Sequence, residues 1–183
     1  RWLGQDVVVK FFGHGDSFHH VVNVYKRLEA RKVKGVRLPL HAEASHRCLI
    51  FPCLPSTFGA LPAGGSKHFD AYFRSLSACV HDCHAAGVIH NDVLPQNITF
   101  DSRTGQVYLI DFELASLDGK REIHGACFAV NESRGNAFGC VGAHWSTPFN
   151  TPPGHTTPSY TAEGDRWAIQ VMHSMASQRR VIG

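Results

Sequence analysis

Short runs of apolar and β-branched side chains, bounded by turn residues, predict four β-strands. These runs occupy residues 7–12, 47–51, 97–100 and 106–110. The first run surrounds a single charged residue, Lys10, and the second ends at Pro52, which has no backbone N–H to offer a sheet. The last two runs flank the turn sequence Asp-Ser-Arg-Thr-Gly at residues 101–105, so we expect them to pair as a hairpin.

Apolar residues three or four positions apart predict three helices. The first follows a turn that ends at Asp16 or Ser17, either of which can cap a helix. The second covers residues 67–86 and stops at Gly87. The third restarts near Asp165, after a stretch rich in proline and threonine that predicts an extended loop.

The first of these predicted helices carries one charged residue on its apolar stripe. The stripe consists of Phe18, Val21, Val22, Tyr25, Leu28 and Glu29. A carboxylate on a buried face needs a partner, because burying an unpaired charge is costly. Glu29 is therefore expected to meet a cation, unless it lies on the helix surface at the edge of the stripe.

The bulk composition indicates a packed protein with a small net charge. The chain has 183 residues, 43% hydrophobic and 18% charged, enough for one domain or two small lobes. The formal charge of +3 is too small to indicate a nucleic-acid partner, and the Lys and Arg residues between positions 26 and 37 are expected to form a solvated face. No apolar run is long enough to span a membrane.

Cysteine and histidine usage leaves two interpretations. The six cysteines lie mostly among apolar neighbours, which favours reduced, buried thiols and a cytoplasmic protein. Cys79, His81, Cys83 and His84 are close enough in sequence to suggest metal ligands. Because Cys79 and Cys83 are also spaced for the inner face of the second helix, burial is the favoured interpretation and zinc the weaker one.

The segment with the most distinctive chemistry runs from His90 to Asn97 and is followed by residues 109–113. It offers Asp92, then Asn97 five positions later, then Asp111 after a predicted strand. Phosphoryl transfer needs these groups, because one carboxylate accepts the proton of the nucleophile while an amide oxygen and a second carboxylate bind magnesium. The hairpin between Asn97 and Asp111 can bring the last two groups to one side of a cleft.

These motifs resemble those of the protein-kinase-like superfamily. The pattern H-R-D-L-x-x-x-N matches His90, Asp92 and Asn97, the D-F-G motif matches Asp111 and Phe112, and residues 7–10 resemble the V-A-I-K strand. The resemblance covers about residues 7–112. It implies an α+β, two-lobed fold, with an incomplete, β-rich small lobe in residues 1–54 and a truncated, mainly helical large lobe in residues 55–183.

The resemblance also implies the roles of the site residues, with ATP and Mg²⁺ as cofactors. Asp92 would be the catalytic base, helped by Asn97, and Asn97 and Asp111 would bind magnesium. Lys10 would contact the α- and β-phosphates and would be held by Glu29. The adenine hinge would be formed by Phe51, Pro52 and Leu54.

Several positions depart from the family pattern. Asn91 replaces an arginine, Leu94 replaces a lysine, and Glu113 replaces the glycine of D-F-G. His-Asn-Asp with Asp-Phe-Glu is also similar to choline kinases and aminoglycoside phosphotransferases. Only Gly4 precedes Lys10 where a Gly-rich phosphate loop is expected, and the chain stops at Gly183, so it reads as a fragment or a shortened product.

Three functions follow as hypotheses. The first is an ATP-dependent kinase acting on Ser or Thr of a protein substrate. The second, favoured by Asn91, Leu94 and Glu113, is a kinase for a small hydroxyl-bearing substrate. The third, favoured by the missing Gly-rich loop, is a pseudokinase or interaction module without turnover. The ATP motifs do not identify the acceptor.

Overall fold

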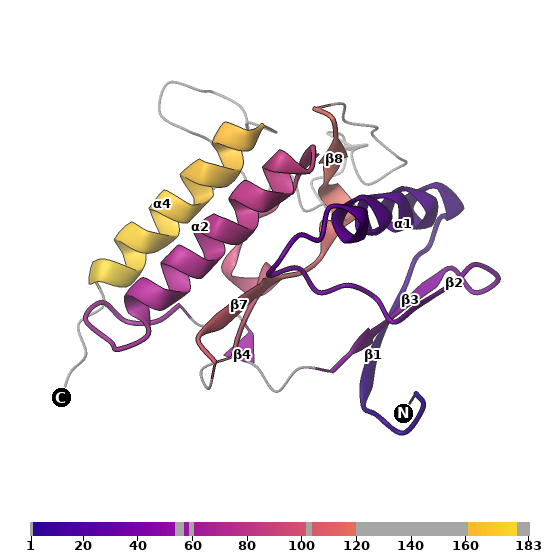
Figure 1. Cartoon of the computed structure of the whole chain (residues 1–183), viewed down its shortest axis with the longest axis horizontal. Coiled ribbons are helices and arrows are strands. Elements are labelled where there is room, and N and C mark those ends of the chain that lie inside the picture. Colours follow the sequence, from indigo (N-terminus) through magenta and orange to yellow (C-terminus); the bar gives the residue numbers. More distant parts are fainter. Residues whose placement is uncertain (1, 54–56, 59–60, 102–103, 120–160, 179–183) are drawn as a thin grey trace, which may run out of the picture.

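In a computed structural model of the chain, the structure describes residues 2–53, 57–58, 61–101, 104–119 and 161–178. Figure 1 shows the arrangement of their helices and strands. In chain order the elements are β1 (Val7–Phe11), α1 (Gly15–Ala30), β2 (His41–Glu43), β3 (Cys48–Pro52), β4 (Thr57–Phe58), α2 (Phe69–Ala85), β5 (Val88–Ile89), the 3-10 helix η1 (Pro95–Asn97), β6 (Ile98–Asp101), β7 (Gln106–Leu109), the 3-10 helix η2 (Phe112–Leu114), β8 (Ser116–Leu117) and α4 (Ala162–Gln178). This mixture of helix and strand agrees with the α+β expectation.

The first sheet is antiparallel, has the strand order β1-β3-β2, and carries Lys10 opposite Leu49. The strands expected around Lys10 and before Pro52 are confirmed, and Pro52 is the last residue of β3. β2 was not expected, because its three residues, His-Ala-Glu, lack the β-branched and aromatic side chains that mark a strand. Figure 1 shows α1 running beside this sheet.

Helix α1 differs from its expected form at both ends. Its N-cap is His14, whose side chain makes no capping hydrogen bond, and Asp16 lies inside the first turn. The expectation that Asp16 or Ser17 caps the helix is therefore wrong, although the Asp16 carboxylate is well placed for the helix dipole. The buried residues of α1 are Phe18, His20, Val21, Val24, Tyr25 and Leu28.

Glu29 is exposed, so the apolar stripe was assigned too widely. The buried face is centred on Val21, Val24 and Leu28, and a helix turns by about 100° per residue, which places Val22 and Glu29 at its edge. Val22 is accordingly only partly buried. A one-residue error in the centre of the stripe thus moves Glu29 from the core to the solvent.

The second sheet has the order β4-β6-β7 and contains the expected hairpin, with Phe100 opposite Val107 and Asp101 opposite Gln106. Helix α2 packs against β7, and α4 lies beside α2 (Figure 1). The buried residues of α2 are Tyr72, Phe73, Leu76, Cys79, Val80 and Cys83. Gly87 stops the helix as expected, with a φ of 77° that favours glycine.

A short pair of strands, β5 and β8, joins the end of α2 to the segment that follows Asp111. Val88 pairs with Leu117 and Ile89 with Ser116. Arg27 of α1 donates to both carboxylate oxygens of Asp118, at 3.0 and 3.3 Å. These contacts hold the chain between β5 and η1 close to the chain between β7 and β8, and both stretches carry predicted site residues.

Side-chain placement partly agrees with the expectations from composition. The four described cysteines are free thiols, and Cys48, Cys79 and Cys83 are buried as expected, whereas Cys53 is exposed. Within the described ranges, no helix is both long and apolar enough to cross a bilayer. Most of the proline- and threonine-rich stretch lies outside the described residues.

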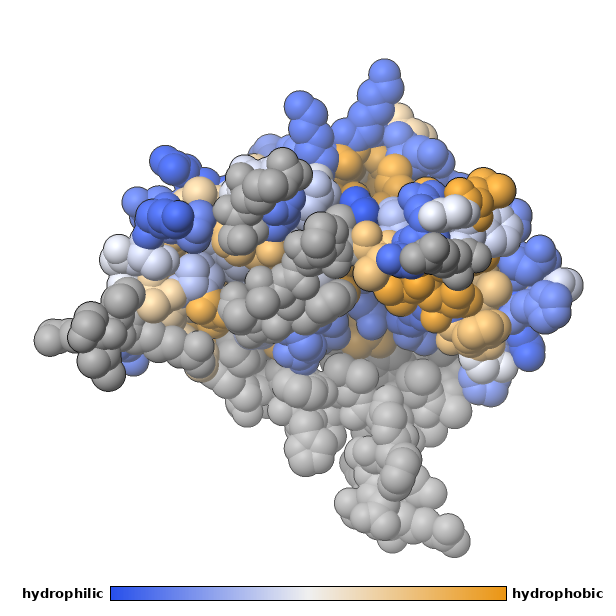
Figure 2. All heavy atoms as spheres, turned by 90° about the horizontal axis from the view of Figure 1, so that it is seen from below, coloured by the Kyte–Doolittle hydropathy of each residue, from blue (hydrophilic) through white to orange (hydrophobic). Residues whose placement is uncertain are grey.

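Exposed apolar side chains occur on both faces of β1, because successive residues of a strand point to opposite sides. Val8 is 50% exposed and Phe11 is 68% exposed, whereas Phe12, the next residue along the chain, is buried. Figure 2, which views the molecule from below, shows hydrophobic surface on the side where β1 lies. Lys10 therefore shares its face of β1 with Val8, and Phe11 lies on the opposite face.

Candidate active site

A cavity of about 180 Å³ lies between the first sheet, α1 and the chain that leaves β7. Its lining is mostly apolar, and the charged residues among those that line it are Lys10, Arg37 and Asp111. Phe51 and Pro52, two of the three predicted hinge residues, line this cavity, and the third, Leu54, lies outside the described residues. The strand register explains this placement, because Val8 and Lys10 of β1 pair with Phe51 and Leu49 of β3.

Lys10 is held by two carboxylates at this cavity. Its Nζ lies 2.6 Å from Asp111 Oδ1 and 2.8 Å from Glu113 Oε2. Burial alone would lower the pKa of Lys10, but the ion pairs with Asp111 and Glu113 outweigh it and raise the pKa above its ordinary value. Lys10 is therefore a fixed positive charge at neutral pH.

The predicted pairing of Lys10 with Glu29 is wrong in this structure. Glu29 lines a different depression, between α1 and residues 38–42, with Tyr25 and Leu49 shared between the two hollows. The side chains that α1 does present to the Lys10 cavity are Val21 and Tyr25, neither of which carries a negative charge. The carboxylates that meet Lys10 come instead from the segment after β7.

Asp92 and Asn97 are brought together as the sequence suggested. The Asn97 amide nitrogen donates to Asp92 Oδ2 at 2.6 Å and to the Asp92 backbone carbonyl at 2.9 Å. These two bonds fold residues 92–97 into a closed loop that ends in η1 and leave the amide oxygen of Asn97 outside the pair. Asn97 thereby orients the carboxylate of Asp92.

The other carboxylate oxygen of Asp92 has unusual surroundings. Asp92 is 7% exposed, and its Oδ1 is buried without a hydrogen-bond partner in the described structure. Burial raises the pKa of Asp92, an effect that the hydrogen bond from Asn97 partly offsets. A buried, unpaired carboxylate oxygen is costly, so a group that supplies a donor to this position is favoured.

His90 links this loop to the chain that carries Asp111. Its Nε2 donates to the carbonyl of Ile110 at 2.9 Å, and its Nδ1 accepts from the backbone N–H of Asp92 at 3.2 Å. These two bonds require the neutral ring with the proton on Nε2. The ring also packs edge-on against Phe112, with centroids 4.6 Å apart. Both polar bonds are to the backbone, which is an architectural role.

Asp111 begins η2 from a left-handed backbone conformation, with φ 63° and ψ 70°. The preceding residue, Ile110, donates its backbone N–H to the carbonyl of Asn97 at 2.9 Å. This bond ties Asp111 to the Asp92–Asn97 loop, and the negative charge of Asp111 adds to the rise in the Asp92 pKa. The structure therefore brings together Asp92, Asn97, Asp111 and Lys10.

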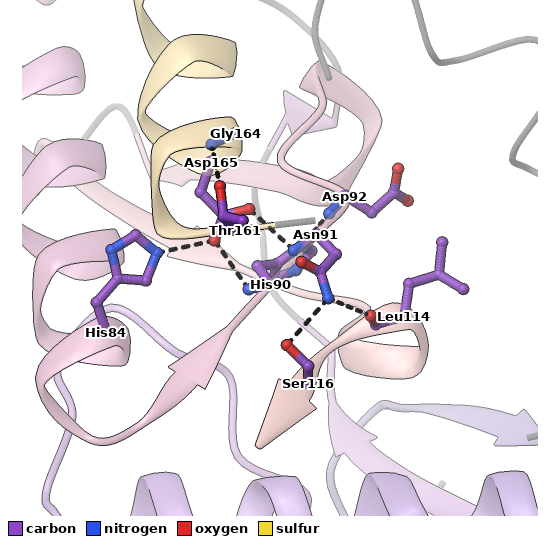
Figure 3. Close-up of polar contacts among 9 residues, drawn as sticks. All are labelled: His84, His90, Asn91, Asp92, Leu114, Ser116, Thr161, Gly164 and Asp165. Carbon is purple, nitrogen blue, oxygen red and sulfur yellow. Dashed lines mark hydrogen bonds and ion pairs between the residues drawn. The ribbon is translucent and has the colours of Figure 1, made fainter. Parts of the chain in front are cut away.

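Asp165, at the start of α4, anchors the loop and was not singled out as a site residue (Figure 3). Its Oδ2 accepts from the backbone N–H of His90 at 2.8 Å and from His84 Nε2 at 2.9 Å, and its Oδ1 accepts from the backbone N–H of Asn91 at 2.9 Å. Asp165 is 2% exposed, so this carboxylate is a buried charge held by three donors. A charged residue among the apolar positions of α4 was the available signal.

Asn91 is the second unforeseen contact. Its backbone is left-handed, with φ 65°, and its amide nitrogen donates to the Leu114 carbonyl at 2.8 Å and to Ser116 Oγ at 3.3 Å. Figure 3 shows this side chain reaching toward Leu114 and Ser116 while the Asp92 carboxylate points away from the cluster. Asn91 thus fastens the loop to the chain that follows Asp111.

The alternative zinc site is not assembled in the described part of the chain. There, no three His, Cys, Asp or Glu side chains come together in a way that could hold a metal ion. Cys79 donates to the carbonyl of Gly35 at 3.0 Å, and His84 is engaged by Asp165. The predicted magnesium ligands, Asn97 and Asp111, include only one residue of these four types, so they do not count as such a group.

Comparison with known proteins supports a kinase-like relationship over part of the chain. No family model matches. The chain is 38% identical over 68 residues to the cell cycle serine/threonine-protein kinase hsk1 of Schizosaccharomyces pombe, covering 37% of this chain and 13% of that protein. It is 44% identical over 48 residues to CBL-interacting protein kinase 30 of Oryza sativa subsp. japonica, covering 26% and 10%.

A third relative is serine/threonine-protein kinase pim-2 of Danio rerio, with 35% identity over 54 residues, covering 30% of this chain and 16% of that protein. The matches therefore span less than a fifth of the length of these relatives, from 10% to 16%. Over these partial alignments, the chain is similar to Ser/Thr protein kinases.

Proposed function

We propose that the chain is an ATP-dependent phosphotransferase that transfers the γ-phosphate to a Ser or Thr hydroxyl of a protein. The observation that carries this proposal is the pairing of Lys10 with Asp111 at one apolar cavity, with the Asp92–Asn97 loop bonded to the residue before Asp111. The partial similarity to Ser/Thr protein kinases supports the protein acceptor. The cavity takes side chains from both predicted lobes, residues 1–54 and 55–183, which supports a site at their junction.

The side chains fit the chemistry of ATP and magnesium. Phe51, Leu49 and Val8 offer an apolar surface for a flat base, and Lys10 offers a cation for phosphate oxygens. The Asp111 carboxylate and the Asn97 amide oxygen are hard oxygen ligands of the kind that Mg²⁺ takes. When bound, Mg²⁺ would neutralise charge on the phosphates.

Asp92 is proposed as the base. Its Oδ1, buried and unpartnered, accepts a hydrogen bond from the acceptor hydroxyl and takes its proton as the phosphoryl group transfers. Asn97 holds Oδ2, which leaves Oδ1 as the carboxylate oxygen without a partner in the described structure. Asp165 and Asn91 keep the loop in place through its backbone and the neighbouring segment. The raised pKa of Asp92 makes it a stronger base than an exposed carboxylate.

A small hydroxyl-bearing acceptor is the second candidate. Leu94, two residues after Asp92, is fully buried, so the loop places no cation there to contact the γ-phosphate of a nucleotide. In the Ser/Thr protein kinases that the sequence resembles, a lysine stands at the position of Leu94. This difference favours an acceptor site whose specificity comes from other elements.

The nucleotide site is tested first by a thermal-shift titration of the chain with ATP, with and without Mg²⁺, beside Asp111→Asn. Ligand at about one hundred times its dissociation constant stabilises a protein by about 2.7 kcal/mol, which is readily measured. A magnesium-dependent shift that Asp111→Asn abolishes is expected. A cooperatively folded chain that shows no shift would overturn the proposal and favour a module without turnover.

The acceptor is tested by transfer of labelled γ-phosphate. Ser- and Thr-containing peptides are compared with small hydroxyl compounds such as amino alcohols and amino sugars under the same conditions. Label on the peptides supports the protein acceptor, and label on the small compounds alone supports the second candidate.

A further inference from the structure

Both carboxylates that meet Lys10 come from one short segment. Asp111 and Glu113 lie 2.6 and 2.8 Å from Lys10 Nζ, and the residue between them, Phe112, is fully buried. Phe112 packs against Tyr25 and His90 with ring centroids 5.4 and 4.6 Å apart. Because Phe112 points into the core, Asp111 and Glu113 both remain free to face Lys10.

The local backbone explains this convergence. Asp111 is in the left-handed region, and its Oδ1 accepts from the backbone N–H of Glu113 at 3.4 Å at the start of η2. This turn folds the side chain of Glu113 back toward that of Asp111. The segment is fixed from its other end by Asn91, which donates to the Leu114 carbonyl. The position of Glu113 therefore depends on the Asp92 loop.

We propose that Glu113 is the positioning residue for Lys10, the role that the family resemblance assigned to Glu29. The inference rests on the proposed function, because Lys10 is positioned for phosphate groups. α1 contributes Val21 and Tyr25 to the cavity, so it offers no competing carboxylate there. The carboxylate that meets Lys10 of β1 is consequently supplied by η2 and not by α1.

Charge balance favours Glu113 over Asp111 as the lasting partner of Lys10. Asp111 is the carboxylate that the proposed function assigns to the metal, so its charge is shared with a cation in the loaded site. Glu113 then remains as the anion that keeps Lys10 directed into the cavity. Without it, Lys10 retains the Phe12 ring, whose centroid lies 5.4 Å from Nζ, as a weaker neighbour.

The test measures the dissociation constant of MgATP by calorimetry on the full chain and its variants. Glu113→Gln is expected to weaken binding about fivefold, the fold change of a partly exposed ion pair worth about 1 kcal/mol. Glu113→Asp keeps the charge and should recover part of the affinity. Glu43→Gln is the matched control, because Glu43 bonds Ser45 and lies outside the Lys10 cavity.

Three results would overturn the inference. Glu29→Gln weakening MgATP as much as Glu113→Gln would return the role to α1. If Glu113→Gln binds MgATP with unchanged affinity, Glu113 does not position Lys10. If the variant binds MgATP more tightly, Glu113 competes with the phosphates for Lys10. In a background of Lys10→Met, Glu113→Gln should have no further effect, because its action passes through the lysine.

A nucleotide-free readout separates this inference from the proposed function. A double-mutant cycle of Lys10→Met and Glu113→Gln on the urea unfolding equilibrium should be non-additive if the two side chains pair in the folded chain. Additive effects would overturn the pairing even if MgATP binds. A different outcome is that the cycle is non-additive while the wild-type chain fails to bind MgATP. That pair of results would overturn the proposed function but keep the pairing of Lys10 with Glu113.

Discussion

Asp92 owes its proposed chemistry to its surroundings rather than to its type. One of its oxygens is held by Asn97 at 2.6 Å and the other is buried without a partner. Such an arrangement costs folding free energy, which a protein tolerates where a ligand supplies the missing donor. The same reasoning separates Asp92 from Asp165, whose two oxygens are both occupied.

Asp92→Asn is expected to lower phosphoryl transfer by about a hundredfold to ten-thousandfold, the usual contribution of a general base. The amide is isosteric and can still bond to Asn97, so MgATP affinity should change little. Single-turnover transfer and calorimetric binding check the two parts separately. Asp70→Asn, on the exposed side of α2, serves as the control, and wild-type turnover in Asp92→Asn would remove this residue from the role.

Asp165→Asn is expected to destabilise the folded chain by about 2–3 kcal/mol, because buried hydrogen bonds to a charged acceptor are lost or weakened. Three donors, from His84, His90 and Asn91, converge on this carboxylate, and an amide group cannot accept from all of them in the same geometry. Urea denaturation measures the loss. Glu163→Gln, in the same helical turn, should stay within about 0.5 kcal/mol of the wild type.

The residue scale also shows where sequence reasoning reaches its limit. Asp92 and Asn97 could be identified because both lie on one short loop with a recognisable spacing. Glu113 is two positions after Asp111 in sequence, but it is the left-handed backbone of Asp111 that turns the Glu113 side chain toward Lys10. Asp165 reaches the loop from 75 residues away, and no local periodicity encodes such a contact.

At the scale of elements, the sequence pattern of apolar residues predicts those strands and helices that bury one face. The hairpin β6–β7 was predictable because a turn sequence separates two apolar runs, and α2 because its buried residues recur at helical spacing. The edge of the buried face of α1 could not be predicted, because burial changes gradually around the circumference of a helix, as Val22 and Glu29 show. Packing partners, which set that edge, lie far away in sequence.

Gly64→Ala tests how α4 is docked. A Cβ at Gly64 would lie 2.8 Å from the carbonyl oxygen and 2.9 Å from the Cα of Ser177, so the backbone of α4 would have to move. The Gly64 N–H also donates to the Ala176 carbonyl at 2.8 Å. Overpacking of this kind costs about 1–3 kcal/mol, measured as the change in unfolding free energy.

The control for this substitution is Gly13→Ala. Gly13 has no heavy atom within 4 Å of an added Cβ, and its backbone is outside the left-handed region. It should therefore change stability by no more than about 0.5 kcal/mol. Equal effects of the two substitutions would mean that α4 does not press on Gly64 in solution.

At the scale of the whole molecule, three aromatic rings join its parts. Tyr25 of α1 packs edge-on against Phe51 of β3 and against Phe112 of η2, with centroids 5.6 and 5.4 Å apart. Phe112 in turn contacts His90 beside the Asp92 loop. The first sheet, α1 and the proposed catalytic segment therefore share one hydrophobic core, which also contains the buried faces of α2 and α4.

Such a shared core should make the chain unfold as one unit, and Tyr25→Ala should break that unity. Removing a buried aromatic side chain costs about 3–5 kcal/mol, and here the loss falls on the contact between the parts. Two single-tryptophan versions report on each side, one keeping Trp2 near His41 and one keeping Trp167 on α4. Their urea midpoints should coincide in the parent chain and separate when Tyr25 is alanine.

Tyr25→Phe keeps the ring and its packing, so both probes should again report one transition, with a loss of no more than about 1.5 kcal/mol. This variant separates the contribution of the ring from that of the hydroxyl. Coincident midpoints in Tyr25→Ala would show that other contacts couple the parts, such as Arg27 with Asp118 and His20 with the Ala115 carbonyl. Adding Arg27→Ala to Tyr25→Ala would then be expected to bring the midpoints apart, because it removes one of the polar connections between α1 and the segment after Asp111, another being His20 Nε2 with the Ala115 carbonyl at 2.7 Å.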